Sequence, residues 1–145
     1  MVEKLQQALQ NGFQPALGHT LGFRVTAVGK GEATVEMDTN SAHHNPMGSL
    51  HGGVLCSIAD TAMGFAHSST LDDGETSTTL ELHINFLRPV WDAKLRAVGR
   101  VIKAGRTISL IECDVFDEKA RLVARASSTC MTLRGEQAEG RQLLR

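Results

Sequence analysis

The alternation of apolar and polar residues along the chain predicts the order of its elements. Apolar residues recur at near-helical spacing over residues 2–9, which predicts a short N-terminal helix. Alternating patterns over 21–28 and again over 33–37, with a glycine-rich break between them, predict a hairpin of two strands. The stretch over residues 38–50 is a polar loop by composition, and loops of this length are usually functional.

A buried helix is predicted over residues 51–66, directly after this loop. On a helical projection, one sector gathers the larger apolar side chains, and the opposite side carries small residues and one carboxylate. The apolar sector comprises Val54, Leu55, Ile58, Ala62 and Phe65, and the opposite side carries Cys56, Asp60 and Gly64. Asp60 is therefore expected to face away from the apolar stripe, with room above it for a substrate or another backbone.

Four strands are predicted after the helix. Residues 79–89 alternate cleanly, and two further strands over 93–103 and 107–115 are joined by the tight turn 104–106. A last strand is predicted over 121–133. In the first of these strands, one face is expected to carry Leu80, Leu82, Ile84 and Phe86, and the other Thr79, Glu81, His83 and Asn85.

The order of helix, hairpin, helix and four-stranded meander predicts an α+β fold. One antiparallel sheet is expected to pack against one principal helix. The 145 residues fit a single domain, 1–145. Its core is expected over residues 20–133, and the polar segment 134–145 is expected to form a loose C-terminal tail.

Charge and composition narrow the range of functions. The chain has 15 Lys and Arg against 16 Asp and Glu, and 4% aromatic residues, which argues against a nucleic-acid partner. No apolar run approaches the roughly 20 residues of a membrane span, and the N-terminus lacks the order of a signal peptide. We therefore expect a cytoplasmic protein with no membrane partner, whose three cysteines form no structural disulfide.

The candidate chemistry lies where the loop enters the predicted helix. His51 is followed by Gly52 and Gly53, so bare backbone N–H groups stand where they suit a carbonyl oxygen that becomes negative in acyl transfer. The Asp60 carboxylate, about two turns further on, could act on water or on the carbonyl carbon. The residues alone leave a structural alternative open, in which His51 only caps the helix and a neighbouring backbone pairs with the acid.

Other polar residues give weaker signals. His43 and His44 are adjacent, with no third ligand at a recognisable spacing, so no metal site is expected. The chain also lacks the glycine-rich motifs of nucleotide-binding proteins. Arg88, Lys103 and Arg106 stand at predicted strand ends or turns, where basic residues are most often solvated yet suit a phosphate-bearing ligand.

These positions together resemble the hotdog-fold acyl-CoA thioesterases, and among them the phenylacetate-pathway (PaaI-like) type. The resemblance covers residues 21–133, and its loop-to-helix motif is its more specific part. It rests on Asn45, Gly48, His51-Gly52-Gly53, Asp60 with Ala62 following, Phe86-Leu87-Arg88-Pro89 and Gly105-Arg106. It implies a long central helix wrapped by a curved antiparallel sheet, and hydrolysis of an acyl-CoA to a carboxylic acid and free CoA.

The resemblance also implies roles for single residues in a shared site. The Gly52 N–H would polarise the thioester carbonyl, while Asn45 and His51 position the thioester or the attacking water. Asp60, reaching in from a partner subunit, would be the general base or the nucleophile. This arrangement implies a homodimer that builds two shared active sites, and by analogy a dimer of such dimers.

A hydroxyl on the strand after the helix assists in such enzymes. Thr79 is the first candidate, with Ser77 and Thr78 as alternatives. No metal is expected, and no cofactor other than CoA as part of the substrate. The residues expected to bind the substrate are Gly53, Arg88, Lys103 and Arg106, the last two near the CoA phosphates.

Two alternative functions share this scaffold. A hotdog enoyl-CoA hydratase would use a histidine and an aspartate close in sequence, whereas the order His-Gly-Gly followed by Asp60 fits a thioesterase better. A non-catalytic acyl-CoA-binding module would need an added partner domain, against which the balanced charge and short chain argue. The acid is Glu in some relatives, and the shorter Asp leaves both direct attack and water activation open.

Overall fold

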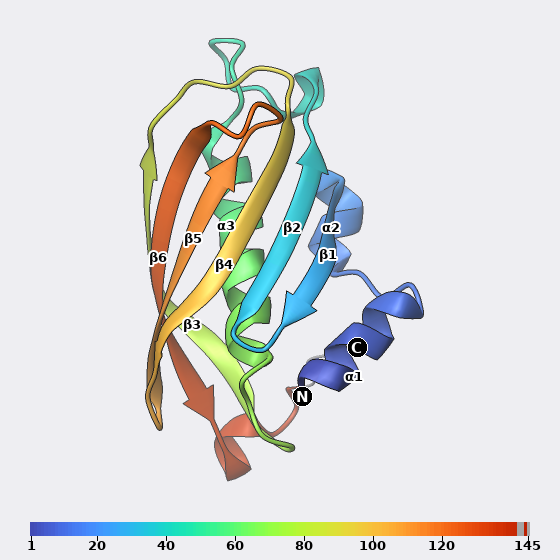
Figure 1. Cartoon of the computed structure of the whole chain (residues 1–145), viewed down its shortest axis with the longest axis vertical. Helices are drawn as coiled ribbons and strands as arrows, with labels where there is room; N and C mark the ends of the chain where they lie inside the picture. Colours follow the sequence, from blue (N-terminus) through green and yellow to red (C-terminus); the bar gives the residue numbers. More distant parts are fainter. Residues whose placement is uncertain (142–143, 145) are drawn as a thin grey trace.

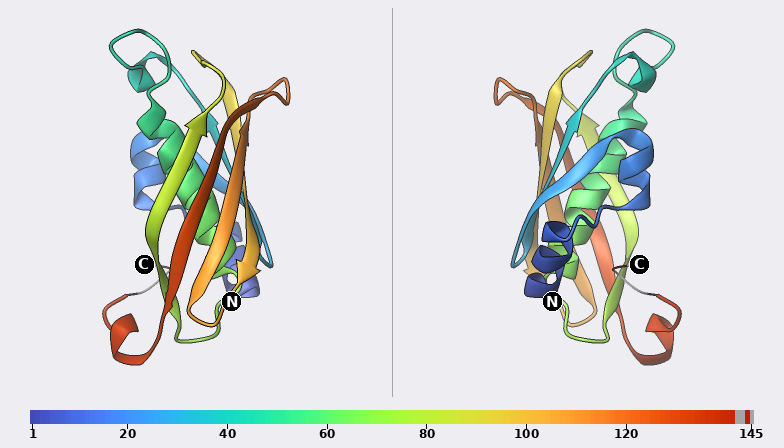
Figure 2. Two further views of the ribbon diagram at one scale, coloured as in Figure 1. Left: turned by 90° about the vertical axis from the view of Figure 1, so that its left-hand side faces the viewer. Right: turned by 90° about the vertical axis from the view of Figure 1, so that its right-hand side faces the viewer.

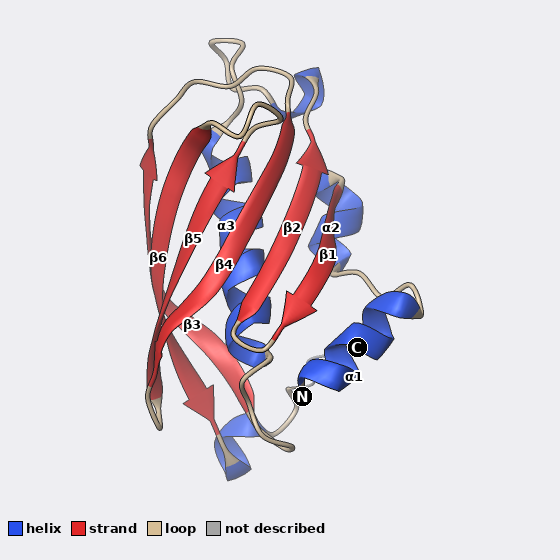
Figure 3. Ribbon diagram, viewed as in Figure 1, coloured by secondary structure: helices blue, strands red, loops and turns tan. Residues whose placement is uncertain are grey.

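The computed structural model describes residues 1–141 and residue 144. Its six strands form one antiparallel sheet in the order β1-β2-β4-β5-β6-β3, which curves around the long helix α3 (Figures 1 and 3). The elements in chain order are α1 (Val2–Gln10), α2 (Ala16–Leu21), β1 (Phe23–Gly29), β2 (Glu32–Asp38), η1 (Ser41–His43), α3 (Gly52–Ser68), β3 (Thr76–Phe86), β4 (Lys94–Ala104), β5 (Ile108–Phe116), β6 (Leu122–Leu133) and η2 (Gly135–Ala138). The predicted α+β architecture is confirmed.

The core lies between α3 and the concave face of the sheet (Figure 2). Ile58 and Ala62 of α3 are fully buried there, as the apolar stripe of the predicted helix requires. Met63, which the predicted stripe did not include, is fully buried as well. The helix approaches β4 so closely that a Cβ on Gly99 would lie 2.6 Å from the backbone carbonyl of Ala62. A glycine at this point of β4 therefore sets how near the helix comes to the sheet.

Helix α2 was not predicted, and the first strand begins two residues later than predicted. Six residues are too few to show an apolar period, so α2 left no clear pattern in the sequence. It ends at Gly22, whose φ of 87° is a conformation that glycine adopts without strain. Both α1 and α2 pack near β1, where Leu5 of α1 is fully buried (Figure 2).

The predicted faces of β3 are wrong at two neighbouring residues, Thr79 and Leu80. A bulge places Leu80 as an extra residue in β3, because Thr79 pairs with Cys130 of β6 while Glu81 pairs with the next residue, Thr129. Paired residues share a face, so Thr79 lies on the inner face together with Leu82 rather than with Glu81. Leu80 is left 55% exposed.

β3 forms one edge of the sheet and pairs with β6, and no other strand of the described residues pairs with it. The predicted polar tail includes η2, and Arg134 just before it pairs with Glu75 at 2.5 Å; residues 142, 143 and 145 of the tail lie outside the described residues. Within the described part of the chain, no helix is long and apolar enough to span a membrane.

Candidate active site

The N-terminus of α3 presents a bare backbone donor. His51 is the cap residue, and its Nδ1 accepts a hydrogen bond from the Gly53 N–H at 2.8 Å, so the neutral ring carries its proton on Nε2. The Gly52 N–H hydrogen-bonds to no other described residue, as expected in the first turn of a helix. The positive end of the helix dipole therefore offers this N–H to a ligand.

Gly52 is held tightly against the end of β3. A Cβ at this position would lie 2.8 Å from Cζ of Phe86, so the aromatic ring fills the space that a side chain would need. The two residues border a cleft of about 400 Å³, whose walls are mainly apolar. It is lined by Asn45, Ser49, Leu50, Gly52, Leu55, Phe86, Leu87, Arg88, Pro89 and Val90.

Asn45 shapes the loop in front of this cleft. Its Oδ1 accepts hydrogen bonds from the backbone N–H groups of Met47 at 2.9 Å and Ser49 at 3.3 Å, and its Nδ2 donates to the Ser49 hydroxyl at 3.0 Å. Asn45 thus lines the cleft. Its amide is already committed to the turn, with one N–H left over.

The adjacent histidines of the loop have separate partners. His43 bonds the Leu21 carbonyl through Nε2 and accepts from the Asn40 N–H through Nδ1. His44 contacts Asp92 at 3.0 Å. No group of three or more metal-ligating side chains occurs in the described residues.

Asp60 lies farther along α3, on its exposed side. It is eight positions further along the helix than Gly52, which corresponds to about 12 Å along the helix axis. Thr79 Oγ1 donates a hydrogen bond to Asp60 Oδ1 at 3.1 Å. Of the three hydroxyls considered from the sequence, Thr79 is therefore the one placed against the carboxylate, because the bulge at Leu80 turns it inward.

Two buried residues of β6 lie behind Thr79, and sequence reasoning assigned them no role. Cys130 Sγ is 3.9 Å from Thr79 Oγ1 and 3.6 Å from Ser128 Oγ. Cys130 and Ser128 are each 1% exposed. Only the pairing of β3 with β6 brings them near Asp60, so no signal in the sequence marked them.

The match to known proteins settles the family. A family model described as the thioesterase superfamily matches residues 47–124, a span that includes His51, Gly52, Asp60 and Thr79. The chain belongs to the thioesterase superfamily. With its curved sheet around one long helix, this thioesterase has the hotdog fold, and it is a thioester hydrolase.

Three similar proteins support this assignment. The structure of a thioesterase from Haemophilus influenzae is 29% identical, with a TM-score of 0.79, over 92% of this chain and 91% of that one. The E. coli PaaI protein from the phenylacetic acid degradation operon is 26% identical, with a TM-score of 0.82, over 92% of this chain and 96% of that one. A 1,4-dihydroxy-2-naphthoyl-CoA hydrolase of Listeria monocytogenes is 27% identical over 78% of this chain and 92% of its own length.

The predicted site residues of this thioesterase fall into three places within one chain. Gly53 and Arg88 lie near Gly52 at the N-terminal end of α3. Asp60 and Thr79 lie midway along the helix. By contrast, the exposed Lys103 and Arg106 stand at the β4–β5 turn, at the opposite end of the sheet from the start of α3 (Figure 1).

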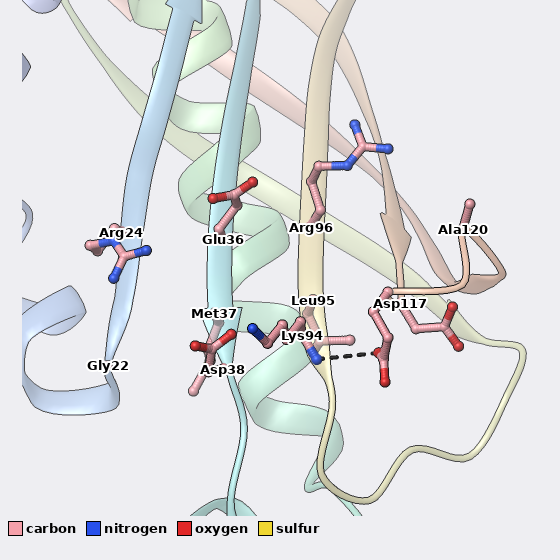
Figure 4. A pocket seen from close by; sticks show the side chains of 11 residues that line it. Gly22, Arg24, Glu36, Met37, Asp38, Lys94, Leu95, Arg96, Asp117 and Ala120 are labelled. Atoms are coloured by element: carbon pink, nitrogen blue, oxygen red, sulfur yellow. Dashed lines mark hydrogen bonds between the residues drawn. The ribbon is translucent and has the colours of Figure 1, made fainter.

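A second hollow, of about 440 Å³, lies on the outer face of the sheet (Figure 4). Its walls are charged, and the sheet separates it from α3. It is lined by Gly22, Arg24, Glu36, Met37, Asp38, Lys94, Leu95, Arg96, Asp117, Glu118 and Ala120. Its lining includes neither Gly52 nor Asp60.

Proposed function

We propose that this thioesterase hydrolyses acyl-CoA thioesters to a carboxylic acid and free CoA, at a site built by two copies of the chain. The proposal rests on two groups of α3: an exposed Asp60 that accepts a hydrogen bond from Thr79, and a Gly52 N–H that donates to none of the described residues. The name of the Listeria relative, a naphthoyl-CoA hydrolase, supports CoA as the carrier.

Hydrolysis by this mechanism requires the Gly52 N–H and the Asp60 carboxylate at the same thioester. The Gly52 N–H donates to the carbonyl oxygen and stabilises the negative charge that develops there. Asp60 takes a proton from water as the water oxygen bonds to the carbonyl carbon. The C–S bond then breaks, and the CoA sulfur leaves with the proton that Asp60 took from the water, which regenerates the carboxylate.

Direct attack by Asp60 is the other route to the same products. The carboxylate oxygen would bond to the carbonyl carbon and expel CoA, leaving an anhydride that water hydrolyses to regenerate Asp60. Direct attack requires an Asp60 oxygen within about 3–3.5 Å of the thioester carbon. Water activation requires Asp60 within hydrogen-bond reach of a water that itself lies at that distance from the carbon. The hydrogen bond from Thr79 fixes the carboxylate for either route.

One chain alone does not bring the two groups together, since about 12 Å of helix separates them. The edge strand β3 contacts both groups. Phe86 of β3 packs on Gly52, and Thr79 of β3 donates a hydrogen bond to Asp60. If the β3 edges of two copies pair antiparallel, the Phe86 end of one strand lies beside the Thr79 end of the other. The same pairing brings Gly52 of one copy towards Asp60 of the second.

In this arrangement, Lys103 and Arg106 of one copy lie on the side of the second copy's cleft, because the paired edge strands run antiparallel. The phosphates of CoA could then contact these cations, while Arg88 borders the cleft itself. Gly53 follows Gly52 in the first turn of α3, where its N–H donates to His51 Nδ1. The dimer of dimers implied by the resemblance stays a prediction.

Substitution of Asp60 tests the proposed function. We expect Asp60→Asn and Asp60→Ala to lower turnover by about 100-fold or more, because a general base contributes 10²–10⁴-fold to a reaction rate. The assay follows release of free thiol from short, long and aromatic acyl-CoAs. Circular dichroism and CoA binding should stay unchanged, and wild-type turnover in both variants would refute the role of Asp60.

A further inference from the structure

We propose that Cys130 and Ser128 are positioning residues that orient Asp60 through the Thr79 hydroxyl. This inference rests on the proposed role of Asp60 as the reacting carboxylate. The four side chains form one chain of contacts from the buried inner face of β6 to the exposed side of α3: 3.6 Å from Ser128 Oγ to Cys130 Sγ, 3.9 Å from Sγ to Thr79 Oγ1, and 3.1 Å from Oγ1 to Asp60 Oδ1.

The direction of these hydrogen bonds follows from what each group can donate. An ionised Asp60 only accepts, so Thr79 must give it the single hydroxyl proton. The Thr79 oxygen can then only accept, which leaves the Cys130 S–H as its donor. The Cys130 sulfur in turn accepts from the Ser128 hydroxyl, so all three donors point towards the carboxylate.

Burial protects this series of side-chain hydrogen bonds from water. Ser128 and Cys130 are each 1% exposed, so water does not compete for their polar atoms. Burial also raises the pKa of the Cys130 thiol, with the nearby Asp60 charge adding to the effect, so the thiol keeps its proton at neutral pH. Cys130 therefore acts as a donor to Thr79 and not as a competing anion.

The strand pairing explains why these residue types stand here. Thr79 and Cys130 are directly opposite each other in the β3–β6 ladder, and Ser128 is the next inward residue of β6. The bulge at Leu80 brings Thr79 onto the same face. Without a partner below it, the Thr79 hydroxyl would be free to turn between Asp60 and other acceptors.

The test compares two equally buried thiols. Cys130→Ala removes the donor to Thr79, whereas Cys113→Ala removes a thiol of β5 that is also 1% exposed and donates to the Asp114 carbonyl. We expect Cys130→Ala to lower kcat about three- to tenfold with little change in KM, as for the loss of one hydrogen bond. Cys113→Ala should leave kcat at the wild-type value.

Two further variants separate positioning from packing. Cys130→Ser keeps a donor in place and should recover most of the kcat lost in Cys130→Ala. If Cys130→Ala fails to fold, Ser128→Ala tests the same series of hydrogen bonds by removing the donor to Cys130. In a Thr79→Val background, Cys130→Ala should cause no further loss, because the link to Asp60 is already broken.

The outcomes distinguish this inference from the proposed function. Equal kcat values for Cys130→Ala and Cys113→Ala, or additive losses for Cys130→Ala and Thr79→Val, would overturn the positioning role. If the Asp60→Asn variant were inactive in the same assay, the proposed function would survive that result. Wild-type activity of Asp60→Asn would instead refute the proposed function, and the positioning role with it.

Discussion

At the scale of single residues, Gly52 combines two requirements that few side chains could meet together. Its N–H, at the start of α3, donates to none of the residues that the structure describes, and the Phe86 ring occupies the space where a Cβ would stand. The sequence predicted the bare donor from the His-Gly-Gly motif alone. The contact with Phe86 was not predictable, because Phe86 lies 34 positions further along the chain.

A proline at this position tests the donor directly. Gly52→Pro deletes the N–H at the first helical position, where proline is best tolerated, and His51 already has the extended backbone (ψ 129°) that precedes proline. We expect kcat to fall by about 10²–10³, as for removal of one oxyanion-hole donor. Steady-state kinetics with the best acyl-CoA substrate measure the effect.

The matched control for this proline is Gly52→Ala. Alanine adds the same Cβ against Phe86 but keeps the N–H, so it reports the cost of the collision alone. Thermal unfolding of both variants checks the integrity of the helix. Equal kcat values for the alanine and proline variants would show that the N–H does not polarise the carbonyl.

At the scale of elements, β3 shows where an alternating pattern stops being informative. The pattern correctly predicted a strand and its apolar face over Leu82 and Ile84, which pack against the core. It placed Thr79 on the wrong face, because the bulge at Leu80 is a property of the pairing between β3 and β6. A single sequence does not contain the register of that pair, so neither the contact of Thr79 with Asp60 nor its neighbours in β6 could be predicted.

The C-terminal end of α3 makes the stability of the fold depend on pH. His67 is 1% exposed, its Nδ1 has no hydrogen-bond partner among the described residues, and its Nε2 is 3.4 Å from Thr132 Oγ1. Burial lowers the pKa of His67 below its ordinary value of 6.5, although the Glu75 carboxylate acts in the opposite direction. The unfolded chain therefore binds a proton at this histidine more readily than the folded chain does.

The sign of the effect follows from this difference in proton binding. Stability from the neutral His67 is fully present above pH 6.5 and is lost as the pH falls towards the lower folded-state pKa. We expect the thermal midpoint to be lower at pH 5 than at pH 7. The difference should be about 2–4 °C for each kcal/mol by which the free energy of unfolding decreases. Scanning calorimetry at both pH values measures it.

Two glutamine variants assign this pH dependence to one side chain. His67→Gln removes the titrating ring and should show a smaller fall in the thermal midpoint between pH 7 and pH 5. His19→Gln changes an exposed histidine of α2 and should behave like the wild type. An unchanged pH dependence in His67→Gln would show that His67 does not cause the loss.

At the scale of the whole molecule, the order of helices and strands was largely predictable from the sequence. Whether one chain forms a complete active site was not. Apolar periodicity predicted the long helix and the antiparallel strands that the structure contains. The motif residues Gly52 and Asp60 nevertheless lie about 12 Å apart along one helix. The sequence of one chain does not show how two copies lie relative to each other. The shared active site was therefore inferred from the family resemblance and stays a proposal.

Mixed dimers test whether two chains build one site. A dimer of an Asp60→Asn chain and a Gly52→Pro chain pairs the intact Gly52 of the first with the intact Asp60 of the second. Its other site carries both changes. Since an isologous dimer has two equivalent sites, we expect the mixed dimer to recover about half of the wild-type activity.

Co-expression with two different affinity tags and purification over both isolates the mixed dimer. The same tags on two Asp60→Asn chains, and on two Gly52→Pro chains, give the inactive controls. If each chain carried a complete site, every site in the mixed dimer would hold one substitution, and thiol release would stay at the level of these controls. Recovery of activity therefore requires that Asp60 acts on a thioester polarised by the other chain.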